Sequence, residues 1–245
     1  DETDVREMFR YYQQNDMLKG DAEAMITEMK PWYDNYCFAR MSLNDDRVFN
    51  CDMTLYYLSS QVQKHRAPED MVDKNIRTDY SKLKMLARID HDGSHEGSRM
   101  STIEEIAAKG EILVNLHTSF PAEKVADIDN FRSLLYYYGL LTMCGTRGDL
   151  IRMCIPNHCV REQYFGFLRD YYQKYSSIDL HYLNVMLTDL AYDGCWKPFF
   201  ESVARAYREN SSVRDGMEGE RNLQGFLKAY LASVSYTHLR AHETP

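Results

Sequence analysis

Residues 101–155 place a helix, a strand, a second helix and a hairpin in that order, and few small folds accommodate such an arrangement. Apolar residues recur at helical spacing in the first and third segments and alternate in the others. The expected elements are a helix over 101–110, a strand over 111–117, a helix over 127–139, and strands over 140–145 and 149–155 joined by a turn at 146–148. Helices followed by a hairpin predict a winged-helix-like module over 101–175.

Two details of this module follow from spacing. Ser101 precedes Glu104 by three residues, which predicts a capping box at the start of the first helix. The second helix carries apolar side chains at i, i+3, i+4 and i+7, which predicts that one face lies buried under the hairpin. The residues of that face are Phe131, Leu134, Leu135 and Tyr138.

The rest of the chain is predicted to be helical. Helices are expected over 1–14, 21–30, from Asn50 or Asp52 onward, about 79–89, 161–175 after Pro156 and Asn157, 179–194, 195–210 and 216–233. An aromatic strand and turn are expected over 31–49. The fold class is therefore mainly α with small β elements: a helical region over 1–100, the winged-helix-like module over 101–175, and a helical segment over 176–233.

Composition restricts the function classes. The 245 residues carry a formal net charge of −8, so the chain as a whole lacks the basic character typical of nucleic-acid binding. No apolar run reaches the roughly 18 residues that a membrane span needs. Six Cys occur without a CxxC pair, which favours reduced thiols and a cytoplasmic location.

One loop combines several side chains that ligate metals. The text "HDGSHEG" brings together His91, Asp92, His95 and Glu96. Two Gly and a Ser in the same stretch indicate a solvated loop, and a metal site is the alternative.

A second group surrounds the hairpin. Cys144, Cys154, His158 and Cys159 could suggest a zinc ribbon, but the knuckle spacing is wrong and two of the thiols fall within apolar strands. The pattern favours core thiols.

The hairpin also carries basic side chains. Arg147 beside the turn, with Arg152 on the following strand, could contact a phosphate backbone. Asp149 next to the turn weakens the positive electrostatic field of these two residues. The alternative is that the hairpin packs against a neighbouring protein.

The stretch "KPWYDNYCFA" places an acid between aromatic residues. Asp34 is either a turn residue that accepts from backbone amides or a polar group directed at a site on another domain.

This stretch resembles bacterial AAA-ATPase-like proteins, of the kind found in Bacteroidales, that are fused to a PD-(D/E)XK nuclease-like domain. The resemblance rests on "WYDNYCF" with "VFN" after it, "NIRTDYSKLKMLARID", "SFPAEKVADIDNFRSLLYYYGLLTM", "IPNHCVREQYFGFL" and "GERNLQGFLKAYLAS", in this order. The family motif falls on Trp32, Tyr33, Asp34, Tyr36 and Asn50. The family usually has Gly where Asn35 stands and an Asn-Pro pair where this chain has Asn50-Cys51, which removes a Pro suited to the first helical position.

The resemblance implies which parts of a larger protein this chain contains. The P-loop and Mg²⁺ site of such proteins lie upstream of the matching segment, and the nuclease strands lie downstream. Residues 1–100 would then be the helical lid of the ATPase-like domain, 101–175 its winged helix, and 176–233 the first helices of the nuclease-like domain. ATP and Mg²⁺ are expected for the parent protein and no cofactor for this segment. Glu220 falls where related proteins carry an acid facing the nuclease site.

The final stretch "VSYTHLRAHETP", residues 234–245, has neither helical nor strand periodicity and resembles translated adapter sequence from sequencing libraries. We therefore expect an internal fragment that is catalytically incomplete, with the remainder of its own ATPase and nuclease domains as partners. The alternative is a winged-helix module that binds DNA or protein beside a degenerate ATPase. A third hypothesis is a metal enzyme built on the His91 loop.

Overall fold

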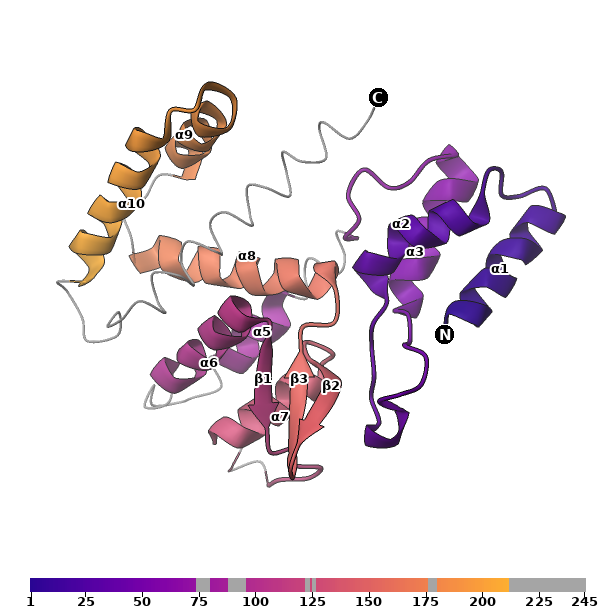
Figure 1. Cartoon of the computed structure of the whole chain (residues 1–245), viewed down its shortest axis with the longest axis horizontal. Helices are drawn as coiled ribbons and strands as arrows, with labels where there is room; N and C mark the ends of the chain where they lie inside the picture. The colour runs from indigo at the N-terminus through magenta and orange to yellow at the C-terminus, as the bar shows by residue number, and fades with distance from the viewer. Residues whose placement is uncertain (74–79, 88–95, 122–123, 125–126, 176–179, 212–245) are drawn as a thin grey trace. The chain divides into compact units, whose positions relative to one another are not determined.

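The computed structural model describes residues 1–73, 80–87, 96–121, 124, 127–175 and 180–211. The described elements are α1 (Glu2–Gln14), α2 (Ala22–Tyr33), the 3-10 helix η1 (Arg40–Ser42), α3 (Cys51–Lys64), α5 (Tyr80–Ala87), α6 (Glu96–Lys109), β1 (Glu111–Val114), α7 (Ile128–Tyr137), β2 (Thr142–Arg147), β3 (Leu150–Cys154), α8 (His158–Tyr175), α9 (Leu180–Asp193) and α10 (Trp196–Ser211). Most of them are helices, and the strands form one small antiparallel sheet (Figure 1). The predicted fold class, mainly α with small β elements, is confirmed.

The chain divides into two compact units. The first comprises residues 1–99 and 110–163, and the second comprises 100–109 and 164–245. Helices α6 and α8 each contribute residues to both units. In the second unit α9 and α10 are neighbouring helices separated by Gly194, whose φ of +68° ends the preceding helix.

The N-terminal helices of the first unit share one core. Asp1 caps α1 through the backbone N–H groups of Thr3 and Asp4. Apolar side chains from α1, α2 and α3 meet in a buried cluster that includes Phe9, Met29, Tyr33, Met53 and Tyr57. Ion pairs between α1 and α2 lie outside this cluster, and they join Arg6 to Glu23 and Lys30 to Glu2.

Helix α2 extends further than its sequence predicts. Pro31 is expected to end the helix at Lys30, yet the helix continues through Pro31 to Tyr33. The reason is burial, because the Tyr33 ring is fully enclosed and its hydroxyl donates to the Met71 carbonyl at 2.8 Å. The strand expected after this point is reduced to a single bridge between Tyr36 and Val48.

The start of α6 is also predicted wrongly. Helix α6 begins at Glu96, so Ser101 lies inside the helix and is exposed, and the predicted capping box with Glu104 does not form a helix start. The buried side chains Met100 and Ile103 show that the helical stripe already includes the residue before Ser101. The spacing that defines a capping box also occurs within helices, which explains the error.

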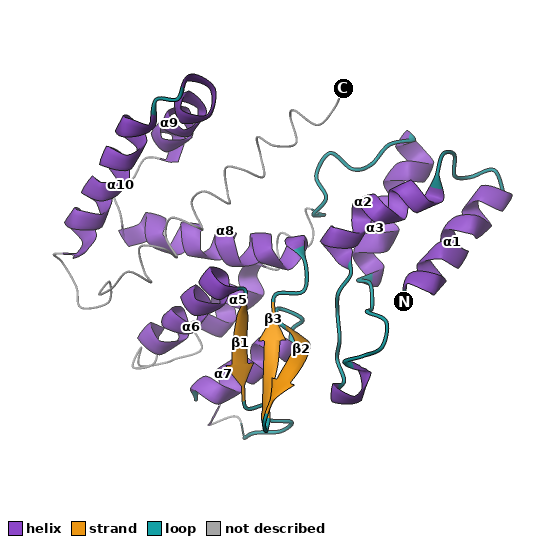
Figure 2. Ribbon diagram, in the orientation of Figure 1, coloured by secondary structure: helices purple, strands orange, loops and turns teal. Residues whose placement is uncertain are grey.

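The sheet has the strand order β1-β3-β2, with both pairs antiparallel (Figure 2). The predicted hairpin is confirmed, but its turn consists of Gly148 and Asp149 rather than residues 146–148. The φ of Gly148 is +61° and that of Asp149 is not positive, which is the pattern of a type II′ hairpin turn. A register shift between Met143 and Gly145 marks a bulge in β2.

Helix α7 contacts both α5 and β1 within the first unit. Phe131 and Leu135 are buried as predicted, and Leu134 is half-buried. Tyr138 is 43% exposed, so its predicted burial is wrong. Helix α7 ends at Tyr137, and Tyr138 is the C-cap residue, whose ψ of 5° turns the chain that follows away from the helical path, so the helix does not continue past it.

Candidate functional site

The segment Trp32–Phe38, which contains four of the five residues expected to form the family motif, leaves the end of α2 and runs beside the residues that precede α3. Tyr36 exchanges two backbone hydrogen bonds with Val48, and the N–H of Asn50 donates to the Tyr33 carbonyl at 2.7 Å. Asn50 then caps α3, because its side chain accepts from the N–H of Met53 at 3.2 Å. The two motif stretches around residues 32–38 and 48–50 therefore form one local structure.

The same segment is hydrogen-bonded to the sheet. The hydroxyl of Thr142 on β2 accepts from the N–H of Cys37 at 2.6 Å and donates to the carbonyl of Cys37 at 3.2 Å. The N–H of Met143 reaches the Cys37 carbonyl at 3.2 Å. From α7, the Tyr136 hydroxyl donates to the Phe38 carbonyl at 2.6 Å. These bonds tie the segment after α2 to the sheet and to α7 within the first unit.

The start of α8 provides a third set of contacts. The side-chain amide of Asn35 donates to the Pro156 carbonyl at 2.8 Å, and that of Asn157 donates to the Asp34 carbonyl at 3.0 Å. The other end of the Asn157 side chain accepts from the N–H of Val160 at 3.2 Å, which is an N-cap of α8. Asn157 therefore links the motif to the first turn of α8.

The backbone of Asn35 adopts a conformation that few residues other than Gly adopt easily. Its φ is +81°, in the left-handed region that Gly occupies without strain and that Asn tolerates better than most residues. Either Gly or Asn therefore permits the turn. The Asn adds the side-chain bond to Pro156.

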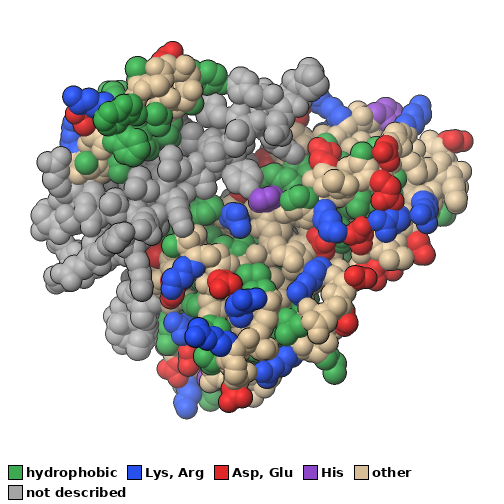
Figure 3. Space-filling model, in the orientation of Figure 1, with side chains coloured by type: hydrophobic (Ala, Val, Ile, Leu, Met, Phe, Trp, Pro, Cys, Tyr) green, Lys and Arg blue, Asp and Glu red, His purple; other side chains and the backbone are tan. Residues whose placement is uncertain are grey.

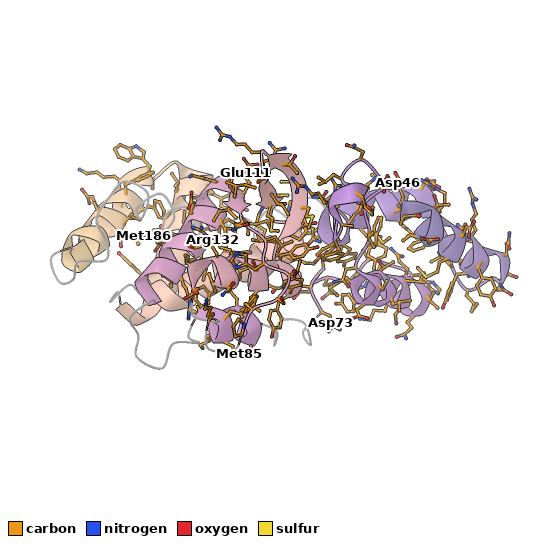
Figure 4. The ribbon with its side chains drawn as sticks, turned by 90° about the horizontal axis from the view of Figure 1, so that it is seen from below. Asp46, Asp73, Met85, Glu111, Arg132 and Met186 are labelled. Atoms are coloured by element: carbon orange, nitrogen blue, oxygen red, sulfur yellow. The ribbon has the colours of Figure 1, made fainter. Side chains whose placement is uncertain are left out.

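These contacts surround a cleft of about 570 Å³ in the first unit. This volume is typical of a site for a small molecule. The cleft is lined by Glu2, Lys30, Pro31, Asp34, Asn35, Asp45, Asp46, Arg47, Ile155, Pro156, Asn157, His158 and Arg161. Asp46 lies on the loop between η1 and α3 (Figure 4).

Asp34 is the buried acid of this cleft, with 5% of its surface exposed. Its Oδ1 atom has no hydrogen-bond partner among the described residues. Burial raises the pKa of its carboxyl above the usual value, opposed by a hydrogen bond from the Asn35 N–H and by the charge of Lys30. The hydrogen bond from the Asn35 N–H agrees with the interpretation of Asp34 as a turn residue, and its role toward a site on another domain stays a prediction.

Two basic side chains of the cleft, Lys30 and Arg47, have identified partners. Lys30 is paired with Glu2, and the guanidinium of Arg47 donates to the carbonyls of Met143 at 3.2 Å and Leu43 at 3.3 Å. The acids are Glu2, Asp34, Asp45 and Asp46 and the bases are Lys30, Arg47 and Arg161, so four minus three leaves one net negative charge with His158 neutral.

His158 and Trp32 form the aromatic part of this region. The two ring centroids are 5.3 Å apart in an edge-to-face arrangement. Burial, with a smaller contribution from the charge of Arg161, lowers the pKa of His158. The imidazole is therefore neutral near neutral pH.

Tyr36 completes the motif contacts. Burial raises the pKa of its phenol, and hydrogen bonds with the side chains of Asn157 and Asn50 oppose that rise. The five residues on which the resemblance places a motif thus lie in one region: Trp32, Tyr33, Asp34, Tyr36 and Asn50.

The hairpin arginines do not form a joint basic surface. Arg147 is exposed beside the turn, while the guanidinium of Arg152 donates to the Cys144 carbonyl at 3.3 Å and lies 3.8 Å from the Glu111 carboxylate. Arg40 is a third basic residue here, and it donates to the Gly148 carbonyl at 3.3 Å. On the face of the first unit in Figure 3, basic and acidic side chains alternate without a large patch of one sign.

The thiols near the hairpin behave as packed side chains. Burial, followed by the neighbouring Cys144, raises the pKa of Cys154 to about 12. Cys159 is buried near the Met71 carbonyl, and burial raises its pKa further. In the part of the chain that the structure describes, no three His, Cys, Asp or Glu side chains are placed to hold a metal ion.

Several predictions lie outside the described residues, among them the helix over 216–233. Others concern the loop His91–His95, whose next residue Glu96 has no described side chain, the acid Glu220, and the stretch 234–245. Within the described ranges, none of the helices combines the length and the apolar character that crossing a membrane requires.

Comparisons with known protein families, with curated proteins and with solved structures give no match to this chain.

Proposed function

We propose that this chain forms the helical lid and winged-helix part of a larger bacterial ATP-binding protein of the AAA-ATPase-like kind. In this proposal the helices after α8 begin a fused PD-(D/E)XK nuclease-like domain, and the protein is cytoplasmic. The segment itself is accessory, since phosphoryl transfer needs a phosphate-binding loop with a Lys and a held Mg²⁺, and the sequence contains no such motif.

The convergence of distant stretches is the observation that carries the proposal. "WYDNYCF", "VFN", "SLLYYYGLLTM" and "IPNHC" are separated widely along the chain, and each carries part of the resemblance. All four meet through the backbone and side-chain bonds of Cys37, Thr142, Asn157 and Asn50. If the resemblance were due to chance, we would not expect the matching residues to contact one another.

The bonds also suggest how the segment would act. A ligand that shifts α2 moves the segment that follows it, and Cys37 is held by Thr142 on β2. Movement at the lid would therefore reach the hairpin through a short, hydrogen-bonded connection. Such coupling is how a nucleotide state can reposition an attached domain.

The test uses the protein extended upstream to include the expected P-loop Lys. Hydrogen exchange of the β2 and β3 amides should change when ATP and Mg²⁺ are added. Thr142→Val should keep nucleotide binding but reduce that change, because it removes both bonds to Cys37. Thr146→Val is the matched control, since Thr146 is exposed on the same strand. An upstream sequence without a P-loop Lys, or equal responses of the two variants, contradicts the proposal.

The present chain provides a second test. It should show only background phosphate release and no Mg²⁺- or Mn²⁺-dependent nicking of plasmid. Turnover that survives repurification and is lost in Glu220→Ala would place a working nuclease site in the segment and refute its accessory role.

The second candidate function is a winged-helix module that binds DNA or protein. Its supporting observation is the exposed Arg147 beside a hairpin turn that Arg40 also reaches. Fluorescence anisotropy with duplex DNA tests it: binding that weakens in Arg147→Ala and falls with salt would favour this function. Absence of binding at low salt would remove DNA as the ligand.

A further inference from the structure

The Asp34 carboxyl is an unusual feature of the cleft, and its position does not depend on the proposed function. Only 5% of the residue is exposed, and Oδ1 has no hydrogen-bond partner among the described residues. A buried carboxylate without a partner is costly to the fold, whereas an Asn of the same shape would carry no charge. An acid at this position therefore indicates a function beyond packing.

The neighbouring groups do not neutralise this acid. Asn157 donates to the backbone carbonyl of Asp34 rather than to its side chain. Lys30, whose charge is felt at Asp34, makes its ion pair with Glu2. The N–H of Asn35 is hydrogen-bonded to the carboxyl, Oδ1 is left without a partner among the described residues, and Asp34 is one of the residues that line the cleft.

The chemistry of the lining selects the class of ligand. An ionised carboxylate only accepts hydrogen bonds, so the ligand must donate one. A metal ion is disfavoured, because the described residues include no group of three side chains able to ligate it. The lining carries one net negative charge, with Asp45 and Asp46 among its acids, which favours a cation over an anion.

We propose that the cleft binds an organic cation, with a guanidinium or alkylammonium group that donates an N–H hydrogen bond to Oδ1 of Asp34. Such a charge-assisted bond supplies the partner that the buried carboxylate lacks. At about 570 Å³ the cleft has room for more than the cationic group, so the group can belong to a larger molecule. The cation is either a free small molecule or the side chain of an Arg or Lys in a polypeptide.

The first experiment compares two cations by ligand-observed NMR with the purified chain. Methylguanidinium carries N–H donors, and tetramethylammonium has the same charge without them. Methylguanidinium should bind saturably and shift the carboxyl carbon resonance of Asp34, and tetramethylammonium should do neither. Equal binding of the two cations, or no binding of either, overturns the proposal. This test uses the parent chain alone and does not depend on the folding of any variant.

The second experiment uses matched variants, each checked for folding by circular dichroism. Asp34→Asn should weaken methylguanidinium binding about tenfold or more, because it removes a charged hydrogen-bond acceptor. Asp46→Asn removes the same charge from the lining but not from the buried position, so it should weaken binding only slightly. Equal losses in the two variants would show a general charge effect and contradict a specific bond to Asp34.

A third comparison separates the two sources of the cation. An acetylated and amidated Gly-Arg-Gly peptide is compared with methylguanidinium, and with the same peptide carrying neutral citrulline. Tighter binding of the Arg peptide assigns the site to a polypeptide side chain, and equal binding assigns it to a free cation. A citrulline peptide that binds as well as the Arg peptide overturns the need for a cation.

Discussion

Asn157 connects two elements that are far apart in the sequence, and its removal should destabilise the first unit substantially. Its side chain caps α8 through Val160 and donates to the Asp34 carbonyl at 3.0 Å, and the residue is 8% exposed. Loss of an N-cap costs about 0.5–2 kcal/mol. A buried carbonyl left without its donor costs about 1–3 kcal/mol. Because one side chain provides both bonds, we expect Asn157→Ala to lower the free energy of unfolding by about 2–4 kcal/mol.

Urea unfolding monitored by Trp32 fluorescence provides the assay. The chain has two Trp, and Trp196 belongs to the second unit, so the series is made in a Trp196→Phe background. Trp32 lies against His158, whose ring centroid is 5.3 Å away, and it therefore reports on the start of α8 directly. An unchanged slope against urea is required before the midpoints are converted to free energies.

Two further variants separate the contributions. Asn157→Asp keeps an acceptor for the N–H of Val160 but removes the donor to Asp34, so it should recover about 1 kcal/mol of the loss and no more. Asn115→Ala alters an exposed Asn outside the cleft and should change stability by less than about 0.5 kcal/mol. The reasoning is refuted if Asn157→Ala matches Asn115→Ala, or if Asn157→Asp is as stable as the parent chain.

Three further outcomes are expected. Leu135→Ala should cost about 2–5 kcal/mol in the same urea assay, since Leu135 is fully buried in α7; a cost below about 1 kcal/mol would contradict its place in the core. Burial raises the pKa of Asp34 in the folded state. The protonated carboxyl therefore contributes its full stability below the ordinary pKa of 3.8, and this contribution is lost as the pH rises through the raised pKa. The free energy of unfolding of Asp34→Asn, relative to that of the parent chain, should therefore be higher at about pH 7 than at about pH 3. An equal difference at the two pH values would refute the raised pKa. Deletion of 234–245 should leave the thermal midpoint within about one degree, and a clear loss would show that this stretch contributes to the fold.

Periodicity predicted the existence of the described helices better than their ends. The hairpin followed from two alternating runs around Gly148, because turn chemistry is local. The ends at Tyr33 and Glu96 were missed because burial of side chains, including a bond from Tyr33 to Met71, outweighs the local signals of Pro31 and Ser101. Tertiary contacts decide such boundaries, and a single sequence does not display them.

The candidate site was predictable in part. Asp34 was singled out because an acid between aromatic residues is unusual, and Asn157 was expected to begin a helix after Pro156. That the Asn157 amide would reach the Asp34 carbonyl, 123 residues earlier, could not be predicted, because no local pattern encodes a pairing at that separation. The roles of Lys30 and Arg47 were missed for the same reason, because the sequence around a Lys or Arg does not indicate which group its side chain will contact.

Asn35 shows how one backbone feature connects these observations. A left-handed φ of +81° at Asn35, two residues after the end of α2, turns the chain, and the N–H of Asn35 is hydrogen-bonded to the Asp34 carboxyl in the lining of the cleft. Gly would make the same turn, but only a side chain can reach the Pro156 carbonyl at 2.8 Å. Asn at this position therefore has less backbone freedom than Gly would have but gains a bond to Pro156, just before α8. Since Asn157 binds the adjacent carbonyl from the same turn of α8, the two amides together hold the buried acid at a fixed position, as binding of a small ligand requires.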